Sequence, residues 1–345
     1  MTRWLMPPEG TPHERLWLAW PSKGYTLGET AEDAETARRT WAAVANAAAR
    51  FEPVTVVVDP TAVGVARHYL AADVEIRVRE IDDAWIRDTG PTFVYGDDGS
   101  LGAVTWTFNG WGQQEWATWD LDATLAPAVA GWAGATRVDS PLVNEGGGFH
   151  VDGLGTVLVT ETVQLDPRRN PALGKAEVEA ELARTIGADT VVWLPRGLTR
   201  DSGRFGTRGH VDIVATITSP GRVLVHDQRD DAHPDRQVSE QVRAALARAV
   251  DARGEHLEIT AVPAPRTLRD HEGFVDYSYV NHVLVNGAVI ACAFDDPNDV
   301  DAVAILRDAY PGREVVTVDA RPLFARGGGI HCITQQQPVR PAAPG

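Results

Sequence analysis

Cys332 is the residue of this chain best suited to covalent chemistry, and it follows three consecutive glycines, Gly327 to Gly329. A thiol is intrinsically a strong nucleophile, yet at its usual pKa of about 8.5 only a few per cent is thiolate at neutral pH. Glycines let the backbone adopt positive φ and approach a ligand closely. We therefore expect Cys332 to be a presented nucleophile rather than a small buried hydrophobe. Gly328 and Gly329 are expected to lie against the substrate, with a base or a cation nearby.

Four other loops carry side chains that could assist this thiol. Because alternate residues of a strand share a face, we expect His210 and Asp212 to lie on the same side of a strand. Active sites collect titratable groups of this kind, so their recurrence in successive loops favours one shared site. The loops together offer a base, several carboxylates and aromatic rings: Asp82, Trp85 and Asp88 in 81–91, Glu145 in 144–150, His210 and Asp212 in 208–212, and the segment 269–273 with Tyr277.

This set of side chains suits a small substrate that is a delocalised cation. Two carboxylates can hold the N–H donors of a guanidinium through charge-assisted hydrogen bonds, each worth roughly 1.5–3 kcal/mol. An aromatic face such as that of Trp85 can stack on the guanidinium plane. A peptide bond would need neither group, which favours a guanidino compound as the substrate.

Composition limits the other partners and the compartment. The formal net charge of −16 argues against nucleic acid or an anionic membrane as a partner. The N-terminus lacks the apolar stretch of a signal peptide, and no window approaches a membrane span, so we expect a cytoplasmic protein. Cys292, the only other cysteine, lies in the apolar run 287–294, which predicts a buried strand and no disulfide framework. The sequence leaves the oligomeric state open, a homo-oligomer included.

The elements around the loops recur as modules. Strands are expected at 14–20 and 54–58 and a helix at 30–50, followed by short strands near Val74, Thr136, Thr190, Leu257 and Glu314. Each short strand precedes a polar or glycine-containing loop and further strands, and the first four modules continue into helices at 120–132, 175–186, 234–252 and 299–310. The N-terminal strand and helix would complete the fifth module.

Such modules suggest an α/β arrangement around an axis, because each module needs its neighbours to bury its apolar face. We therefore predict one domain over residues 1–338 and a frayed Pro/Ala-rich tail over 339–345. Two ordinary α/β domains with similar unit lengths are the alternative.

In these residues the chain resembles the agmatine deiminase family, one of the guanidino-modifying enzyme families that share the five-bladed pentein fold. The likeness covers nearly the whole chain, and its most specific part is the run from Gly328 to Gln336. It is carried by these segments: Met6-Pro-Pro-Glu9, Trp17-Leu-Ala-Trp-Pro21, Asp83-Ala-Trp-Ile-Arg-Asp88-Thr-Gly-Pro91, Glu145-Gly-Gly, Gly209-His-Val-Asp212, Tyr279-Val-Asn281 and Gly328-Gly-Gly-Ile-His-Cys332-Ile-Thr-Gln-Gln336.

The resemblance implies a pentein α/β-propeller with pseudo-fivefold symmetry and a covalent deimination that needs no metal or organic cofactor. It implies hydrolysis of agmatine to N-carbamoylputrescine and ammonia through a Cys thiouronium, a step of putrescine biosynthesis. The roles that it implies are these: Cys332 as nucleophile, His210 as acid and base, Glu145 as its orienting partner, Asp88 and Asp212 as guanidinium clamps, and Trp85 in the pocket lining. To these we add Asp82 as a further acid in the pocket.

Two departures from the family pattern concern the substrate's tail. Gly10 follows the Met-Pro-Pro-Glu segment, where many members carry an aromatic residue. Arg208 and Ile213 flank the Gly-His-Val-Asp segment, where many agmatine enzymes carry a small or polar residue before it and an asparagine after it. If Arg208 faces the pocket, it would repel the distal ammonium of agmatine, unless a carboxylate such as Asp201 or Asp270 neutralises it.

Several alternatives remain open at this stage. The same chemistry could act on another guanidino compound or on peptidyl-arginine. Asp231-Ala-His-Pro-Asp235 resembles the Asp-Ala-His-x-Asp motif of metal-dependent ureohydrolases, although a binuclear site needs further ligands from other strands. The same residues also suit a helix N-terminus. A non-catalytic binder of guanidino compounds or polyamines would leave Cys332 without a purpose.

Overall fold

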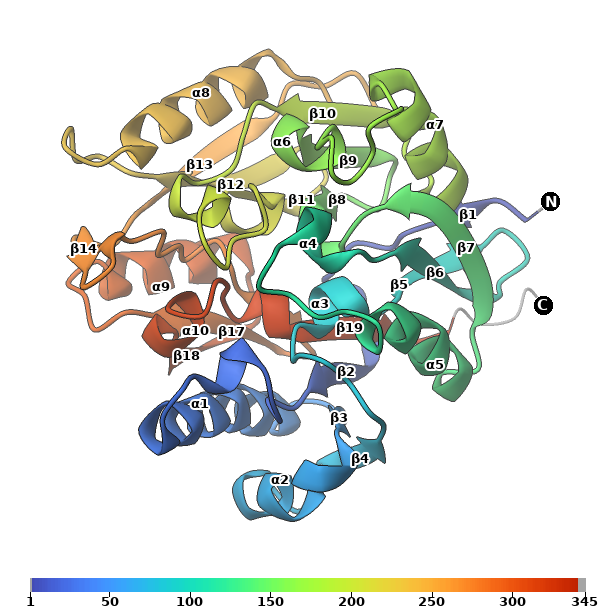
Figure 1. Ribbon diagram of the computed structural model, residues 1–345. Coiled ribbons are helices and arrows are strands. Elements are labelled where there is room, and N and C mark those ends of the chain that lie inside the picture. The colour runs from blue at the N-terminus through green and yellow to red at the C-terminus, as the bar shows by residue number, and fades with distance from the viewer. Residues whose placement is uncertain (1, 341–345) are drawn as a thin grey trace.

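A computed structural model describes residues 2–340 as an α/β fold built from small sheets (Figure 1). The predicted tail is held at its start, because the Val339 N–H donates to the Pro12 carbonyl at 2.9 Å. The Arg340 guanidinium donates to the carbonyls of Ala133 and Gly134. Residues 341–345 of that predicted tail lie outside the described residues.

The described strands form five sheets of three or four strands and one two-stranded ribbon. In each of the five sheets an antiparallel pair is followed by a strand parallel to its second member: β5–β6 then β7, β8–β9 then β10, β11–β12 then β13, β16–β17 then β18, and β19–β2 then β3 and β4. The strands are β1 (Trp4–Leu5), β2 (His13–Ala19), β3 (Val54–Val58), β4 (Glu75–Val78), β5 (Thr92–Gly96), β6 (Leu101–Thr107), β7 (Thr136–Val143), β8 (Phe149–Val151), β9 (Thr156–Thr160), β10 (Thr190–Leu194), β11 (Ala215–Ser219), β12 (Arg222–Asp227), β13 (Glu258–Pro263), β14 (Arg269–Asp270), β15 (Gly273–Phe274), β16 (Val283–Val285), β17 (Ala288–Ala293), β18 (Glu314–Asp319) and β19 (Thr334–Pro338).

The modular pattern predicted from the sequence is confirmed at the level of the strands. The five short strands expected near Val74, Thr136, Thr190, Leu257 and Glu314 are β4, β7, β10, β13 and β18, and each is the last strand of its sheet. The chain ends also meet as expected, because β19 pairs antiparallel with β2, with Gln335 opposite Trp17. The N-terminal strand and the C-terminal strand therefore share one sheet.

The helices agree closely with the predicted ranges, and α1 shows why. Thr30 accepts the Asp33 N–H while Asp33 accepts the Thr30 N–H, a capping box that fixes the start of α1. The predicted helix at 120–132 begins instead as a 3-10 turn, and α8 ends before the predicted limit of 252. The helices are α1 (Ala31–Ala49), α2 (Val63–Tyr69), α3 (Ile86–Thr89), α4 (Gly110–Gln113), α5 (Leu125–Trp132), α6 (Glu161–Gln164), α7 (Lys175–Ile186), α8 (Asp235–Arg248), α9 (Asp299–Ala309) and α10 (Arg321–Phe324).

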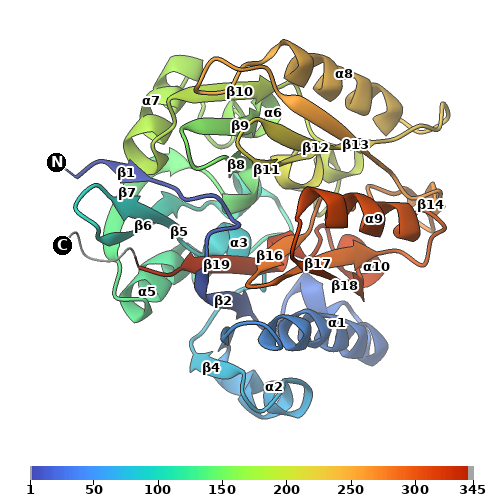
Figure 2. The same ribbon diagram turned by 180° about the vertical axis from the view of Figure 1, so that it is seen from behind.

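The longer helices cover the outside of the sheets and leave short elements in the middle. Figures 1 and 2 show α1, α5, α7 and α8 at the periphery and α3 near the centre of the molecule. Between them lies an apolar core that includes Trp17, Trp41 and the four valines of β3. Cys292 lies in β17 with 2% of its surface exposed, which confirms the predicted buried strand. Among the described helices, none combines the length and the apolarity needed to cross a membrane.

Candidate active site

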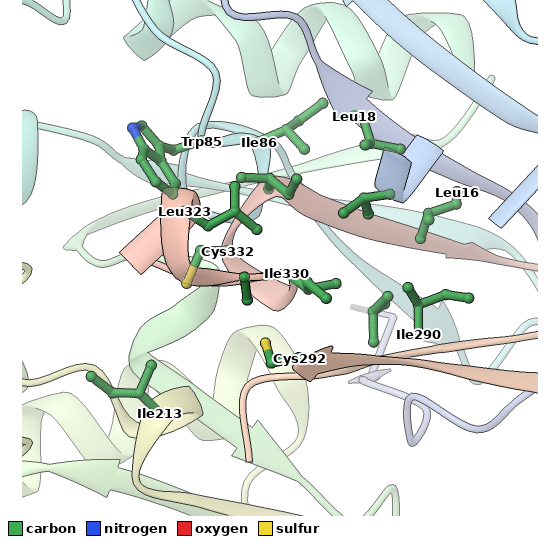
Figure 3. Packing of buried hydrophobic residues seen from close by; sticks show 14 of the residues in the cluster. Leu16, Leu18, Trp85, Ile86, Ile213, Ile290, Cys292, Leu323, Ile330 and Cys332 are labelled. Atoms are coloured by element: carbon green, nitrogen blue, oxygen red, sulfur yellow. The ribbon is translucent and has the colours of Figure 1, made fainter. Parts of the chain in front are cut away.

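Cys332 lies in a buried turn that connects the glycine segment to β19. The turn is the 3-10 helix His331–Ile333, and only 5% of the Cys332 surface is exposed. Figure 3 shows the thiol on this turn, with Trp85 on one side and Ile213 on the other. The thiol is thus buried, and the polar run Thr334 to Gln337 that follows its turn is buried as well.

The three glycines before Cys332 are needed mainly because other side chains pack closely against their backbone, and less because of their φ angles. Only Gly327 has a positive φ, of 96°, whereas the prediction gave all three glycines this use. A Cβ at Gly328 would lie 2.7 Å from the Trp85 ring and 3.1 Å from Cys332 Sγ. A Cβ at Gly329 would lie 2.3 Å from Asn281 Oδ1. Both glycines therefore line the immediate surroundings of the thiol.

The Cys332 thiol has two N–H donors and one carboxylate as its polar neighbours. Asn281 Nδ2 lies 3.3 Å from Sγ, the Gly329 N–H lies 3.4 Å from it, and Asp212 Oδ2 lies 3.5 Å from it. Burial raises the pKa of Cys332 well above its ordinary value, and the charges of Asp212 and Asp88 raise it further. Burial and the two carboxylates therefore both disfavour the thiolate form of Cys332.

Three of the predicted site residues converge on the backbone of Gly147. A Cβ at this position would lie 2.5 Å from His210 Nδ1 and 3.1 Å from both Asp88 Oδ1 and Asp212 Oδ2. The Gly147 N–H donates to Asp88 Oδ1 at 3.0 Å. Glycine is required here by space, since any side chain would displace the charged groups.

His210 is a buried imidazole between two carboxylates. Its Nε2 lies 3.2 Å from Glu145 Oε2, and its Nδ1 lies 3.8 Å from Asp88 Oδ1. Burial alone would lower the pKa of His210, but Asp88 and Glu145 outweigh burial and raise that pKa to about 9. At neutral pH His210 is therefore an imidazolium, able to donate a proton.

The predicted strand at 208–212 is wrong. Arg208 and Gly209 have φ of 74° and 116°, and Val211–Ile213 form a 3-10 turn. The next strand, β11, starts only at Ala215. His210 and Asp212 reach the same site through this turn and not through the alternation of a strand.

Glu145 is held by Arg169, a residue that was not among the predicted site residues. Arg169 Nε lies 2.9 Å and 3.1 Å from the two carboxylate oxygens of Glu145, and both side chains are fully buried. Burial would raise the pKa of Glu145, but Arg169 and His210 outweigh it and lower that pKa. Glu145 therefore stays ionised beside His210.

Asp88 does not pair with its neighbour Arg87. Its second oxygen, Oδ2, accepts the indole N–H of Trp111 at 2.8 Å. Burial raises its pKa to about 6 against the opposing charge of His210. Arg87 instead donates to the His331 carbonyl at 3.2 Å and to Gln336 Oε1 at 2.8 Å, so it braces the turn that carries Cys332.

Trp85 and Asp82, from the same loop, are placed differently. Trp85 is 3% exposed, and its ring packs edge-on against Trp41 at a centroid distance of 5.5 Å. Asp82 Oδ2 accepts the backbone N–H groups of Leu121 and Asp122 at 2.8 Å and 3.3 Å. Asp82 thus anchors a neighbouring loop, while Trp85 lies beside the glycines near Cys332.

The fourth loop contributes Asn281 to the surroundings of the thiol, and not its expected segment 269–273. Its segment 269–273 forms the β14–β15 ribbon, where Asp270 pairs with Arg200 at 2.6 Å. The residue that reaches the thiol is Asn281, whose Oδ1 also accepts the His331 N–H at 2.9 Å. The only signal for Asn281 in the sequence was its place in the Tyr279-Val-Asn281 segment.

Arg208 is neutralised by a carboxylate that we did not foresee. Its Nε lies 3.3 Å from Asp166 Oδ2, and its Nη2 lies 3.4 Å from Gln114 Oε1. Of the expected partners, Asp201 accepts backbone N–H groups, including that of His210, and Asp270 pairs with Arg200. Arg208 thus has a carboxylate partner, but that carboxylate also lies 3.0 Å from Arg169 Nη1, and the two partners named from the sequence were wrong.

The segment that resembles a ureohydrolase motif does not form a metal site. Asp231 is an exposed partner of Arg236, His233 Nε2 bonds to the Val275 carbonyl, and Asp235 accepts the Thr199 N–H. Asp235 is the first residue of α8, so the segment begins a helix. Within residues 2–340 the one group of three or more potential metal ligands is Glu9, His150 and His331, which shares no residue with this segment.

Comparisons with known proteins show the family of the chain. The sequence model of the Porphyromonas-type peptidyl-arginine deiminase family matches residues 5–338. A Streptomyces coelicolor protein provisionally named agmatine deiminase is 55% identical, covering 96% of this chain and 98% of that protein. The agmatine deiminase of Stutzerimonas stutzeri is 40% identical, covering 97% and 95%. The structure of the Enterococcus faecalis agmatine deiminase superposes with a TM-score of 0.91 at 31% identity, covering 98% of this chain and 96% of that one.

Proposed function

Because the chain belongs to the Porphyromonas-type peptidyl-arginine deiminase family, we propose from its site and its relatives that it is an agmatine deiminase. Such an enzyme is a hydrolase that converts agmatine and water to N-carbamoylputrescine and ammonia. The observation that carries the proposal is the convergence of an imidazolium and two carboxylates around Gly147, with the Cys332 thiol 3.5 Å from one of these carboxylates, that of Asp212. A guanidinium is the group that satisfies both carboxylates and meets the thiol.

We infer that the five sheets are the blades of a pentein propeller with pseudo-fivefold symmetry. Every sheet has the same antiparallel and then parallel order of strands. In addition, the loop after the last strand of each sheet supplies a residue of the site: Asp88 after β4, Glu145 after β7, His210 and Asp212 after β10, Asn281 after β13 and Cys332 after β18. Five equivalent loops meeting at one place favour blades around an axis, and a single domain over 1–338.

Substrate binding would itself activate the nucleophile. Asp88 and Asp212 raise the pKa of the Cys332 thiol. A guanidinium held between them cancels that negative charge, so the thiolate becomes more favourable once the substrate is bound. The side-chain N–H of Asn281 and the backbone N–H of Gly329 then stabilise the thiolate.

The covalent step follows from the neighbours of the thiolate. Its sulfur attacks the central guanidinium carbon, and the C–N bond to the departing nitrogen breaks as the His210 imidazolium protonates that nitrogen to release ammonia. His210, now neutral, takes a proton from water, and the hydroxide attacks the thiouronium carbon. The C–S bond then breaks, the hydroxyl proton of the adduct returns the sulfur to a thiol, and the ureido product leaves. Glu145, fixed by Arg169, keeps His210 oriented through both steps.

The product spectrum tests this function. Purified protein incubated with agmatine and excess EDTA is expected to release one ammonia per ureido product and no urea, because the nucleophile and the base are both side chains. Arginine, guanidinobutyrate and an arginine peptide, assayed in parallel, measure the preference among guanidino groups. Urea as a product, or loss of activity on chelation with rescue by manganese, would instead support a ureohydrolase. Two further properties, localisation in the cytoplasm and assembly into a homo-oligomer, remain predictions from the sequence.

Arg208→Asn is expected to change the preference between cationic and anionic tails only slightly. An unpaired Arg208 about 6 Å from the agmatine ammonium would cost roughly 3 kcal/mol at an effective dielectric near 20. The ion pair with Asp166 removes most of that repulsion. The ratio of kcat/KM for agmatine over guanidinobutyrate should therefore change by less than about threefold. A tenfold rise would mean that Arg208 does select the tail.

A further inference from the structure

His331, the residue before the nucleophile, is a buried ring held between two carboxylates. Its Nδ1 lies 2.8 Å from Asp212 Oδ2, and its Nε2 lies 3.1 Å from Glu9 Oε2. Only 4% of His331 is exposed. Its backbone is fixed separately, since its N–H donates to Asn281 Oδ1 at 2.9 Å. The ring is therefore oriented by Asp212 and Glu9 alone among its close polar contacts.

The charges around the ring favour an imidazolium. Burial and the nearby Arg87 would lower the pKa of His331, but Glu9 and Asp212 outweigh them and raise it. Three further titratable groups lie nearby: the Cys332 thiol beside the same Asp212 oxygen, His150 with its ring centroid 6.3 Å away, and His282. Burial lowers the pKa of His282 to about 4, so that it is neutral. His331 can then donate from both nitrogens at once.

The consequence falls on Asp212, the carboxylate nearest the thiol. Oδ2 of Asp212 is hydrogen-bonded to His331 Nδ1 and lies 3.5 Å from Cys332 Sγ. Oδ1 is buried and accepts no hydrogen bond within residues 2–340. A buried oxygen without a donor is costly, and a bound guanidinium supplies the missing N–H.

We propose that His331 is a positioning residue for Asp212: its Nδ1–H holds Oδ2 so that Oδ1 is available to the substrate's guanidinium. Glu9, from the segment before β2, holds the other end of the ring while its Oε1 accepts the Leu284 N–H at 2.8 Å. The N-terminal segment thereby helps to orient the site. The proposal rests on the proposed function, because it takes Asp212 as the carboxylate that binds the guanidinium.

Two matched substitutions of His331 separate positioning from packing. Asparagine places its amide near the position of Nδ1, so His331→Asn keeps a donor for Asp212 and loses the contact with Glu9. Glutamine reaches the position of Nε2, so His331→Gln keeps a donor for Glu9 and loses the contact with Asp212. Each variant loses one buried hydrogen bond, so the two Tm values should fall by similar amounts.

We expect KM for agmatine to rise at least about tenfold in His331→Gln and less than about threefold in His331→Asn. Equal rises in the two variants, or rises that follow Tm, would overturn the proposal. Turnover of agmatine by the wild-type protein in the same assays tests the proposed function separately. If the wild type prefers another guanidino compound, the comparison is made with that compound.

A measurement on the wild-type protein keeps the proposal testable if a variant does not fold. Nitrogen NMR of the histidine rings, with the resonances of His331 identified by their loss in either variant, reports which nitrogens carry protons. We expect a proton on Nδ1 from pH 6 to pH 8. An Nδ1 without a proton in that range would overturn the proposal, because no donor would then face Asp212.

Discussion

Cys332→Ala is expected to lower kcat by about 10⁴-fold or more while agmatine still binds. The loss is large because no other side chain among the close neighbours of the thiol is a nucleophile: they are an amide, a backbone N–H and a carboxylate. Binding survives because Asp88 and Asp212 remain. Calorimetry on the variant should give a Kd for agmatine within about threefold of the wild-type KM, provided that chemistry limits the wild-type rate.

Cys292→Ala is the matched control, since it removes the only other thiol. Cys292 lies in β17, and burial raises its pKa to about 12. Its thiol donates to the Asn281 carbonyl at 2.8 Å and also contacts the Ile330 backbone, behind the turn that carries Cys332. Turnover should fall by no more than about threefold. If Cys332→Ala keeps more than a hundredth of the wild-type kcat, the covalent mechanism is wrong.

The sequence predicted most elements and most of the residues that converge, because both leave local signals. Periodicity predicted α7 over its observed range, and the helix predicted at 30–50 is α1 (Ala31–Ala49). The modular strand pattern predicted that the ends of the chain would share a sheet, as β19 and β2 do. The chemistry-bearing residues Cys332 and His210 were identified from their types and their neighbours.

The site residues that the sequence did not predict are those that hold or contact the reacting side chains, not the reacting side chains themselves. Arg169 stabilises Glu145 and Asn281 contacts Cys332 across 24 and 51 positions of the chain, and one sequence carries no local signal for such pairs. The polar run Thr334 to Gln337 after the nucleophile is a further tertiary feature. It is buried because its amides have internal partners, as when the Trp17 indole N–H donates to Gln337 Oε1 at 2.9 Å.

Local backbone geometry was the other source of error. The alternation rule applied to His210 and Asp212 holds only in a strand, and positive φ at Arg208 and Gly209 turns the chain instead. Space around Gly147, Gly328 and Gly329 is likewise a tertiary property. A sequence marks such glycines without saying which side chains surround them.

Asp212→Asn is expected to change two measurements in opposite directions. It should lower kcat/KM for agmatine by about 10²- to 10³-fold, and it should speed the alkylation of Cys332 by iodoacetamide. The first effect follows because a buried guanidinium loses one of its two charged partners, a loss worth roughly 2–5 kcal/mol.

The second effect follows from the charge on the thiol. After burial itself, Asp212 is the leading cause of the raised pKa of Cys332, and its Oδ2 lies 3.5 Å from Sγ. Removing that negative charge lowers the thiol's pKa, so more thiolate exists at any pH below it. Alkylation by a neutral reagent follows the thiolate fraction. At pH 8 the rate should rise at least about threefold.

The labelling is best measured in the Cys292→Ala background, so that only Cys332 can react. Asp270→Asn is a suitable control, because Asp270 pairs with Arg200 in the ribbon and should leave both the labelling rate and kcat/KM within about twofold. If Asp212→Asn slows labelling as well as turnover, general damage to the site explains both losses, and Asp212 does not set the charge that the substrate must cancel. If labelling speeds up while turnover falls, the carboxylate that suppresses the thiolate in the empty site is also the one that binds the cation. Substrate binding is then what activates Cys332.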